Sequence, residues 1–305
     1  MSNARAATAQ LHAPELSSTQ LALRQVWGLV VYTLRESLHR WTLVTYLLGI
    51  SFFLLLLATT VNLDIVEGTL ASARLFGQEL EIGDMGIKIT DIVRWFQVVV
   101  VGTLYIVGIA LALFLTGNHT PSIARQGWVD LLIAQPVSRS VLLLGRALGS
   151  ITVVALGIAY LIVGSWIVLS WKTGFGNVGF LFAGLVILFT FAVCFSATVL
   201  AGIVTGNGPV SGMIGLFVWA AGHIMHASHA FPEWRTAFRA GWARQVVTVT
   251  SEGLYWLLPK NQGLFQSSFA AARGEPVSLT PIFYSLPFAF LCLFLACWWF
   301  TQRDY

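Results

Sequence analysis

One long stretch of the chain carries no formal charge, and it restricts the possible folds more than any other feature. Residues 173–232 contain no Asp, Glu, Lys or Arg, and the only break is the turn-forming run Thr205-Gly206-Asn207-Gly208-Pro209. The apolar segments on either side are near the roughly 20 residues that a helix needs to cross about 30 Å of hydrocarbon. The stretch therefore predicts two membrane helices joined by a tight turn.

Apolar runs of this kind recur along the whole chain. Hydrophobic residues make up 57% and charged residues 10% of the sequence, whereas a soluble globular chain has roughly 25% charged residues. Tryptophans such as Trp41, Trp95 and Trp171 stand at the ends of runs, where their rings fit the headgroup layer. We predict an all-α polytopic membrane protein with a six-helix domain over 42–305 and spans at 42–61, 96–115, 149–171, 178–204, 210–225 and 282–300.

The residues before the first run divide into two parts. Residues 1–18 are polar and lack periodicity, which predicts a flexible tail. In residues 19–41, apolar side chains share one helical face and mostly basic ones lie opposite, which is typical of an amphipathic helix in the membrane interface. An ordinary extension of the first span is the alternative. The residues expected to contact lipid headgroups are Arg24, Arg35, Arg40 and Trp41.

Residues 116–148 connect the second and third apolar runs. Among the long segments between two apolar runs, this one has a helical pattern that would suit contact with another protein. Trp128, Leu131 and Leu132 have the i, i+3, i+4 spacing of a short amphipathic helix, and Asp130 is turned away from them. We expect this helix to lie at the membrane surface.

A corner should follow this short helix. Pro136 cannot continue a helix and biases the preceding residue away from the helical region. Ser138 is predicted to cap a second helix that begins near Arg139. The segment is thus expected to form two short helices joined by a corner. A span on either side would hold it, so that a displacement of the segment would be passed to these spans.

Charge gives a partial topology. Residues 62–95 are acidic and are expected outside, whereas the basic helix before residue 42 and the basic 116–148 segment favour a cytoplasmic N-terminus. Counts of Lys and Arg over all segments do not decide between the two orientations. In residues 226–281, Trp234, Phe238 and Trp242 recur at i, i+4, i+8, which predicts external helices lying in the interface.

The sequence lacks the residue patterns that several kinds of binding site require. A phosphate-binding loop needs a Gly-Lys pair, but each of the three lysines follows a residue other than glycine. The net charge of +4 is small for a chain of 305 residues and argues against a nucleic-acid partner. We therefore expect neither an ATP site nor nucleic-acid binding in this chain.

Three histidines, His223, His226 and His229, stand at i, i+3, i+6 around the end of the fifth run. From one helix, at most two of them can converge on a metal, and no carboxylate or cysteine is close in sequence. We expect no metal site and regard the three as polar residues of the interface. The alternative is a metal-handling protein or an intramembrane enzyme that uses these histidines.

The residues GWVDLLIAQPVSR at 127–139, followed by LLLGR at 142–146, resemble a pattern of the permease subunits of ABC-2 type ABC transporters. In that family a Gly-Thr-Leu, Leu-Leu, Pro-Val-Ser-Arg, Leu-Leu-Gly-Lys pattern follows the second span. Trp128 stands where the family has threonine. The basic helix before the first span, the six spans, Leu258-Pro259 in a large connection before the last span, and the terminal Gln-Arg-Asp-Tyr are also similar, so the resemblance covers nearly the whole chain.

The resemblance implies a transport subunit that is not itself an enzyme. Its fold would sit in the bacterial inner membrane with both termini in the cytoplasm, would pair with a second copy or a paralogue, and would work in export. ATP and Mg would be bound by a separate ATPase subunit, which would contact Arg125, Gly127, Trp128, Asp130, Leu131, Leu132, Pro136 and Arg139. A surface connection without a partner and a membrane scaffold without transport are the remaining alternatives.

Overall fold

The computed structural model describes residues 18–39, 42–66, 69–75, 78–81, 89–117, 138–231, 233 and 241–302. Helices account for nearly all of this part of the chain. They are α1 (Ser18–His39), α2 (Thr42–Thr60), α3 (Ile89–Thr103), the π-helix η1 (Leu104–Gly108), α4 (Ile109–Thr116), α6 (Arg139–Thr173), α7 (Val178–Thr205), α8 (Gly208–Ala230), α9 (Gly241–Leu257), α10 (Asn261–Arg273) and α11 (Thr280–Gln302).

Long apolar helices are present at the expected membrane spans. Among the described residues, five helical segments are long and apolar enough to cross a bilayer, and the α1–α2 pair, which bends by 70°, adds a sixth if it is counted as one span. The five segments match the second to sixth predicted runs, and the fifth run, the shortest in the prediction, extends to 23 residues as α8. The predicted helical fold with five to six long apolar helices is therefore confirmed, and it is compatible with a multi-pass membrane protein.

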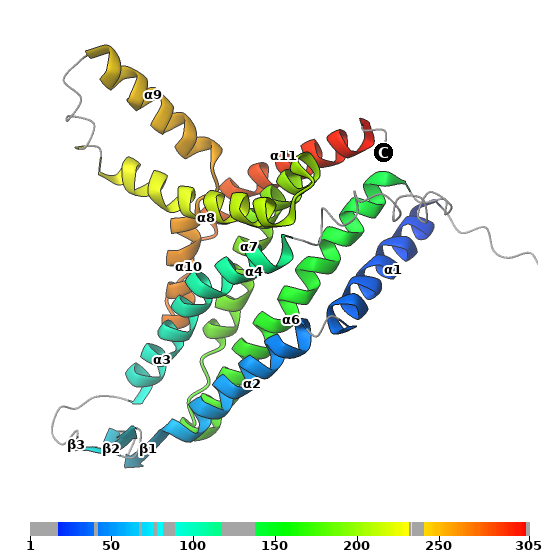
Figure 1. Ribbon diagram of the computed structural model, residues 1–305. Helices are drawn as coiled ribbons and strands as arrows, with labels where there is room; N and C mark the ends of the chain where they lie inside the picture. The colour runs from blue at the N-terminus through cyan, green and yellow to red at the C-terminus, as the bar shows by residue number, and fades with distance from the viewer. Residues whose placement is uncertain are drawn as a thin grey trace, which may run out of the picture.

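Helix α7 lies at the centre of the bundle. More of it is buried than of any other span in the described residues. Its fully buried side chains Phe180, Phe191 and Phe195 form a core with residues of α3, α4, α6, α10 and α11. Helices α4, α6, α8, α10 and α11 pack against α7, and Figure 1 shows α1 along one side of α6. The core of the bundle is thus built around one apolar helix.

Short turns lie at both ends of α7, and the one after its last residue confirms the turn predicted at residues 205–209. Gly174 and Gly206 end the preceding helices with positive φ angles of 68° and 65°, which glycine adopts without a steric penalty. Asn177 and Asn207 then cap α7 and α8 by accepting a hydrogen bond from a backbone N–H of the first turn. These caps fix where α6, α7 and α8 begin and end.

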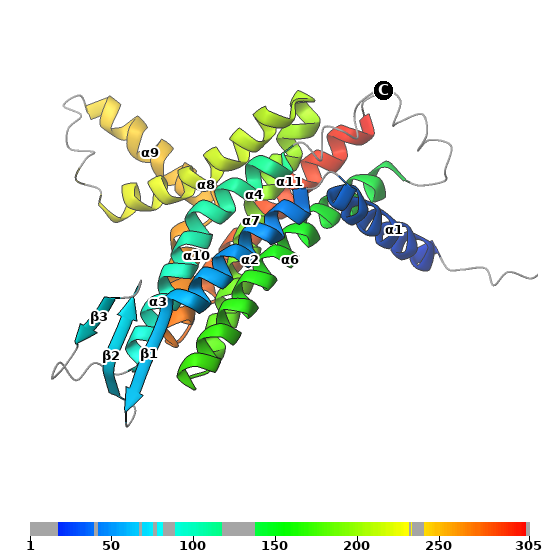
Figure 2. The ribbon, with the colours of Figure 1, turned by 60° about the horizontal axis from the view of Figure 1, so that its bottom comes forward.

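The connection between α2 and α3 contains a small sheet that the sequence analysis did not predict. Strands β1 (Val61–Val66), β2 (Thr69–Leu75) and β3 (Gln78–Glu81) pair antiparallel in the order β1-β2-β3. Figure 2 shows the sheet beyond the ends of α2 and α3. The alternation of Val61, Leu63 and Ile65 with polar residues fits a strand, but the acidic residues of 62–95 favoured a loop.

The region predicted to hold external interfacial helices contains two different helices. Helix α9 has exposed Trp242, Val246 and Val249, and Figure 1 shows it leaving the bundle beside the end of α8. Helix α10 differs from the expectation because it packs against α7 and α3, with Leu264 and Ala272 fully buried. Its small residues allow this close approach. We refer to α9 as the arm.

Candidate functional site

The best-defined functional feature is the joint between α1 and the first turns of α6, which directly follow residues 118–137. Ser138 has an extended backbone and its hydroxyl accepts a hydrogen bond from the Val141 N–H at 3.3 Å. The predicted cap and the predicted helix beginning near Arg139 are therefore confirmed. From this cap α6 continues without a break for 35 residues to Thr173.

A buried ion pair joins the two helices. Arg146 Nη2 lies 2.6 Å from Glu36 Oε2, and the two side chains are only 7% and 17% exposed. The Arg146 guanidinium also lies over the Tyr32 ring, 5.5 Å from its centroid. Removing one partner of a buried pair leaves an uncompensated charge and costs roughly 3–5 kcal/mol. The pair therefore holds α1 in one position against α6.

Small residues bring the same two helices close together. A Cβ added to Gly149 would lie 2.6 Å from Thr33 Oγ1, and one added to Gly145 would lie 2.6 Å from Leu29 Cδ1. Thr33 is buried, and its hydroxyl donates to the Leu29 carbonyl within α1. Glycines at spacing four permit this backbone approach, as in other membrane helix pairs. The α1–α6 joint, defined by Leu29, Thr33, Glu36, Gly145, Arg146 and Gly149, is consequently both close-packed and charge-paired.

The predicted ATPase-contacting residues lie mostly outside the described residues. This applies to Arg125, Gly127, Trp128, Asp130, Leu131, Leu132 and Pro136, and also to the predicted lipid-contacting residues Arg40 and Trp41. Arg139 is the first residue of α6. Arg24 and Arg35 are exposed on α1, whereas Glu36, which the helical pattern placed on the same side, points to Arg146.

Sequence reasoning missed a polar cluster inside the bundle. Asn261, at the start of α10, is fully buried and its Nδ2 donates to the Trp219 carbonyl at 2.9 Å. The Tyr105 hydroxyl donates to the Asn261 carbonyl at 2.6 Å, and Cys194 Sγ lies 3.8 Å from Asn261 Oδ1. Tyr105 belongs to η1, and π-helical turns inside α-helices are frequent at functional sites. The cluster joins four separate segments at one depth of the bundle.

The three histidines have different surroundings. His223 Nδ1 lies 2.8 Å from Gln262 Oε1 and its ring packs against Tyr105, whereas His229 Nδ1 lies 3.1 Å from Glu252 Oε2. His226 lies 6.3 Å from the Tyr255 ring, measured between ring centroids. In the described ranges no group of three or more His, Cys, Asp and Glu residues is arranged to hold a metal.

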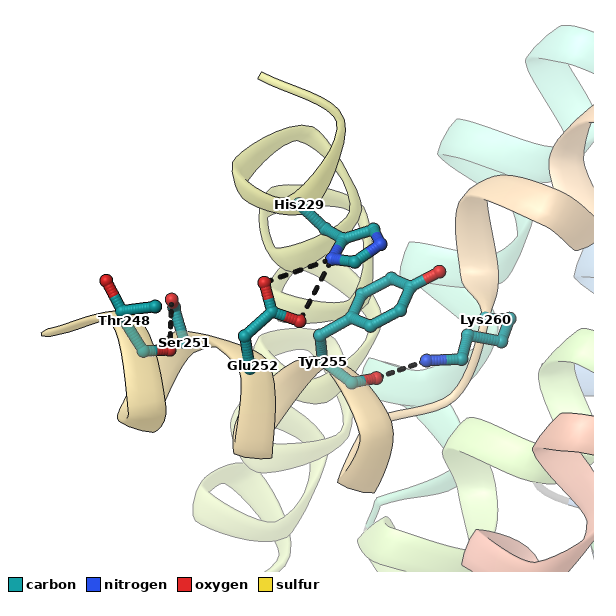
Figure 3. A network of polar contacts seen from close by, with 6 residues as sticks. All are labelled: His229, Thr248, Ser251, Glu252, Tyr255 and Lys260. Atoms are coloured by element: carbon teal, nitrogen blue, oxygen red, sulfur yellow. Dashed lines mark hydrogen bonds and ion pairs between the residues drawn. The ribbon is translucent and has the colours of Figure 1, made fainter. Parts of the chain in front are cut away.

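The arm is held to α8 by exposed contacts, which Figure 3 shows from close by. The His229 ring stacks on the Tyr255 ring with 4.1 Å between their centroids. The Lys260 ammonium donates a hydrogen bond to the Tyr255 carbonyl. Lys260 Nζ also lies 3.3 Å from the Tyr255 ring centroid. Burial lowers the pKa of Lys260 to about 8, and Glu252 partly opposes this shift. The arm therefore depends on groups that are only partly buried.

Comparisons with known proteins leave the family undetermined. A scan against models of known protein families finds no match, and a search of curated proteins finds no relative. The resemblance to ABC-2 type permeases accordingly depends on the residues of this chain and on the helical fold alone.

Proposed function

We propose that this chain is the membrane-spanning permease subunit of an ABC-2 type ABC transporter. A separate ATPase subunit would bind residues 118–137, with Leu131 and Leu132 as apolar contacts and Pro136 setting the corner. The observation that carries the proposal is the α1–α6 joint, because it fixes the interfacial helix to the helix that leads directly out of this segment.

The length of α6 supports its role as the transmitting element. At 1.5 Å per residue, its 35 residues span about 52 Å, and the hydrocarbon layer is about 30 Å thick. The first turns of α6 therefore extend beyond the membrane core, and the joint lies in this extension. A displacement of residues 118–137 would be passed to α6 and α1 as one rigid unit.

Movement of that unit would have to be absorbed inside the bundle. Helix α2 follows α1 and packs on the middle of α6, where Ser51 and Tyr160 share a hydrogen bond at 2.9 Å. The second span contains η1, whose π-helical turn is less regular than the α-helix on either side. We place the conformational change at this turn and at the adjoining Asn261 contacts, where substrate would pass.

The remaining features of the proposal follow from the resemblance. The subunit would form a dimer with a second copy or a paralogue, lie in the bacterial inner membrane with both termini in the cytoplasm, and function in export. ATP and Mg would be bound by the ATPase and not by this chain.

The test is co-purification of the chain with the ATPase of its own organism. Leu131→Asp should leave the permease in the membrane but remove the ATPase from the purified complex, because a charge would replace an apolar contact. Leu279→Asp, at an exposed apolar residue between α10 and α11, is the matched control and should keep the ATPase. Retention of the ATPase by Leu131→Asp would contradict the coupling role.

A further inference from the structure

Three helices meet around a polar cluster at the end of the bundle opposite to the α1–α6 joint. We define the Arg94 cluster as Arg94 and Gln97 of α3, Phe175 and Asn177 of the α6–α7 connection, and Gly274, which follows α10. The beginning of α3 and the ends of α6 and α10 lie toward the lower end of Figure 1, and the joint lies toward the upper end. Neither the sequence analysis nor the proposed function uses these residues.

The hydrogen bonds of Asn177 fix how Gln97 is oriented. Asn177 Oδ1 accepts from the Gly179 N–H at 3.1 Å, and Asn177 Nδ2 donates to the Ala272 carbonyl at 2.7 Å. The same Nδ2 donates to Gln97 Oε1 at 2.8 Å. Gln97 must therefore present its oxygen to Asn177, so that its NH2 group points elsewhere.

The NH2 group of Gln97 is a buried donor. Gln97 is 0% exposed, and its Nε2 has no hydrogen-bond partner in the described part of the chain. A buried donor without an acceptor lowers stability, so native proteins pair nearly all such groups. This donor points to an acceptor supplied by a ligand.

Arg94 adds a second donor and a positive charge. It precedes Gln97 by three residues, which places both on one face of α3. Its guanidinium carbon lies 5.9 Å from the Phe175 ring centroid, and its buried Nε also lacks a partner among the described residues. Asp91 and Glu275 are exposed, and neither forms an ion pair with Arg94 in the described ranges.

Glycine at position 274 lies next to this guanidinium and places no side chain against it. Gly274 has a φ of 75°, and a Cβ there would lie 3.8 Å from Arg94 Nη2 and 3.7 Å from Asn177 Oδ1. A longer side chain would therefore lie over both groups. The N-terminus of α7, with its partial positive charge, begins directly after Asn177.

We infer that Arg94 and Gln97 bind a phosphate group at this end of the bundle. A guanidinium and an amide NH2 are donors only, so they select an oxygen-rich anion. Trp95, which follows Arg94 in α3, is 62% exposed, and Trp171, near the end of α6, is 86% exposed. Exposed tryptophans are typical of the membrane–water boundary, where phosphodiesters are the abundant anions. The phosphate is supplied either by a phospholipid headgroup or by free phosphate.

The first experiment tests lipid binding and uses the purified full chain in detergent. Native mass spectrometry counts the phosphatidylglycerol molecules that remain bound as this lipid is titrated. Arg94→Gln should weaken retention about tenfold or more, because a charge-assisted hydrogen bond is lost. Lys172→Gln removes a cation at the same end of the bundle, outside the cluster, and should retain the lipid as the unchanged chain does.

A second variant separates binding from folding. Gln97→Glu keeps an oxygen for Asn177 Nδ2 but replaces the NH2 donor with a negative oxygen. A purely structural role predicts an unchanged or more stable protein, because the new carboxylate can pair with Arg94. Phosphate binding predicts instead a loss of retention similar to that of Arg94→Gln, in a protein that still elutes as a folded species.

Competition with inorganic phosphate shows whether the bound phosphate group comes from a lipid headgroup or from free phosphate. If phosphate displaces phosphatidylglycerol from the unchanged chain but does not bind Arg94→Gln, the site takes free phosphate. If the lipid remains bound in excess phosphate, the site takes a headgroup. The inference is overturned if both ligands bind the unchanged chain, Arg94→Gln and Gln97→Glu equally, or bind none of them. No ATPase is needed, so failure here is independent of the proposed function.

Discussion

The contact between Glu36 and Arg146 and the contact between His229 and Glu252 each join two neighbouring helices, but the two contacts lie in different surroundings. Glu36 and Arg146 connect α1 to α6 at 2.6 Å with side chains 17% and 7% exposed, whereas His229 and Glu252 connect the arm to α8 at 3.1 Å with side chains 42% and 33% exposed. Water screens the second pair and hardly reaches the first. The same type of contact is therefore structurally decisive in one place and weak in the other.

Because the two contacts differ in exposure, we expect the α1–α6 joint to be rigid and the arm to be easily displaced. The α1–α6 joint combines a buried pair with glycine-mediated close packing, so it should move as one body. The arm has exposed apolar side chains and is held by solvent-accessible contacts, so it should open at low cost in free energy. In the proposed transporter, the joint would be the rigid element that receives the displacement.

The largest effect is expected from breaking the buried pair. Arg146→Ala should lower the free energy of unfolding by roughly 3–5 kcal/mol, because Glu36, which is only 17% exposed, would lose its ion-pair partner at 2.6 Å. Thermal or denaturant unfolding of the purified protein measures this. Arg35→Ala, at the exposed neighbour of Glu36, should change stability by less than about 0.5 kcal/mol. Equal effects of the two variants would refute the rigid joint.

A smaller effect is expected from the close packing in the same joint. Gly149→Ala should cost about 1–3 kcal/mol, because the new methyl group would overlap Thr33. Gly28→Ala on α1 is the matched control, since nothing lies within 4 Å of a Cβ there, and it should instead stabilise the helix by roughly 0.5–1 kcal/mol. The sign of the difference between the two variants decides whether the contact is tight.

Lys260 should give the arm region a dependence on pH. Its pKa is lowered from 10.5 to about 8, mainly by burial. Between these two values the unfolded chain binds more protons than the folded one, so stability rises with pH across this window and is constant below it. In Lys260→Met the rise should be absent. An identical pH profile for both proteins would contradict the shifted pKa.

The smallest effect is expected from the exposed pair. Glu252→Gln should change the free energy of unfolding by less than about 1 kcal/mol, because both side chains are substantially exposed. High salt should leave this variant unaffected and weaken the unchanged protein only slightly. A loss comparable with that of Arg146→Ala would remove the contrast between the two regions.

The sequence predicted the elements whose signals are local. Apolar runs gave the spans, and the Pro136-Val137-Ser138-Arg139 run gave the cap and start of α6. Helical periodicity grouped Glu36 with the exposed arginines, because it cannot show which face meets another helix. Contacts of Tyr105 with Asn261 and of Gln97 with Asn177 span 156 and 80 residues of sequence, so no local pattern reveals them.

The most direct test of the central claim is the side of the membrane on which the two ends of α6 lie. Single cysteines introduced at Arg139 and Lys172, in a background without Cys194, Cys292 and Cys297, are treated with a membrane-impermeant thiol reagent. We predict labelling at position 172 in intact cells and at position 139 only after permeabilisation. Labelling of position 139 in intact cells would place the joint where no ATPase can reach it and would contradict the account.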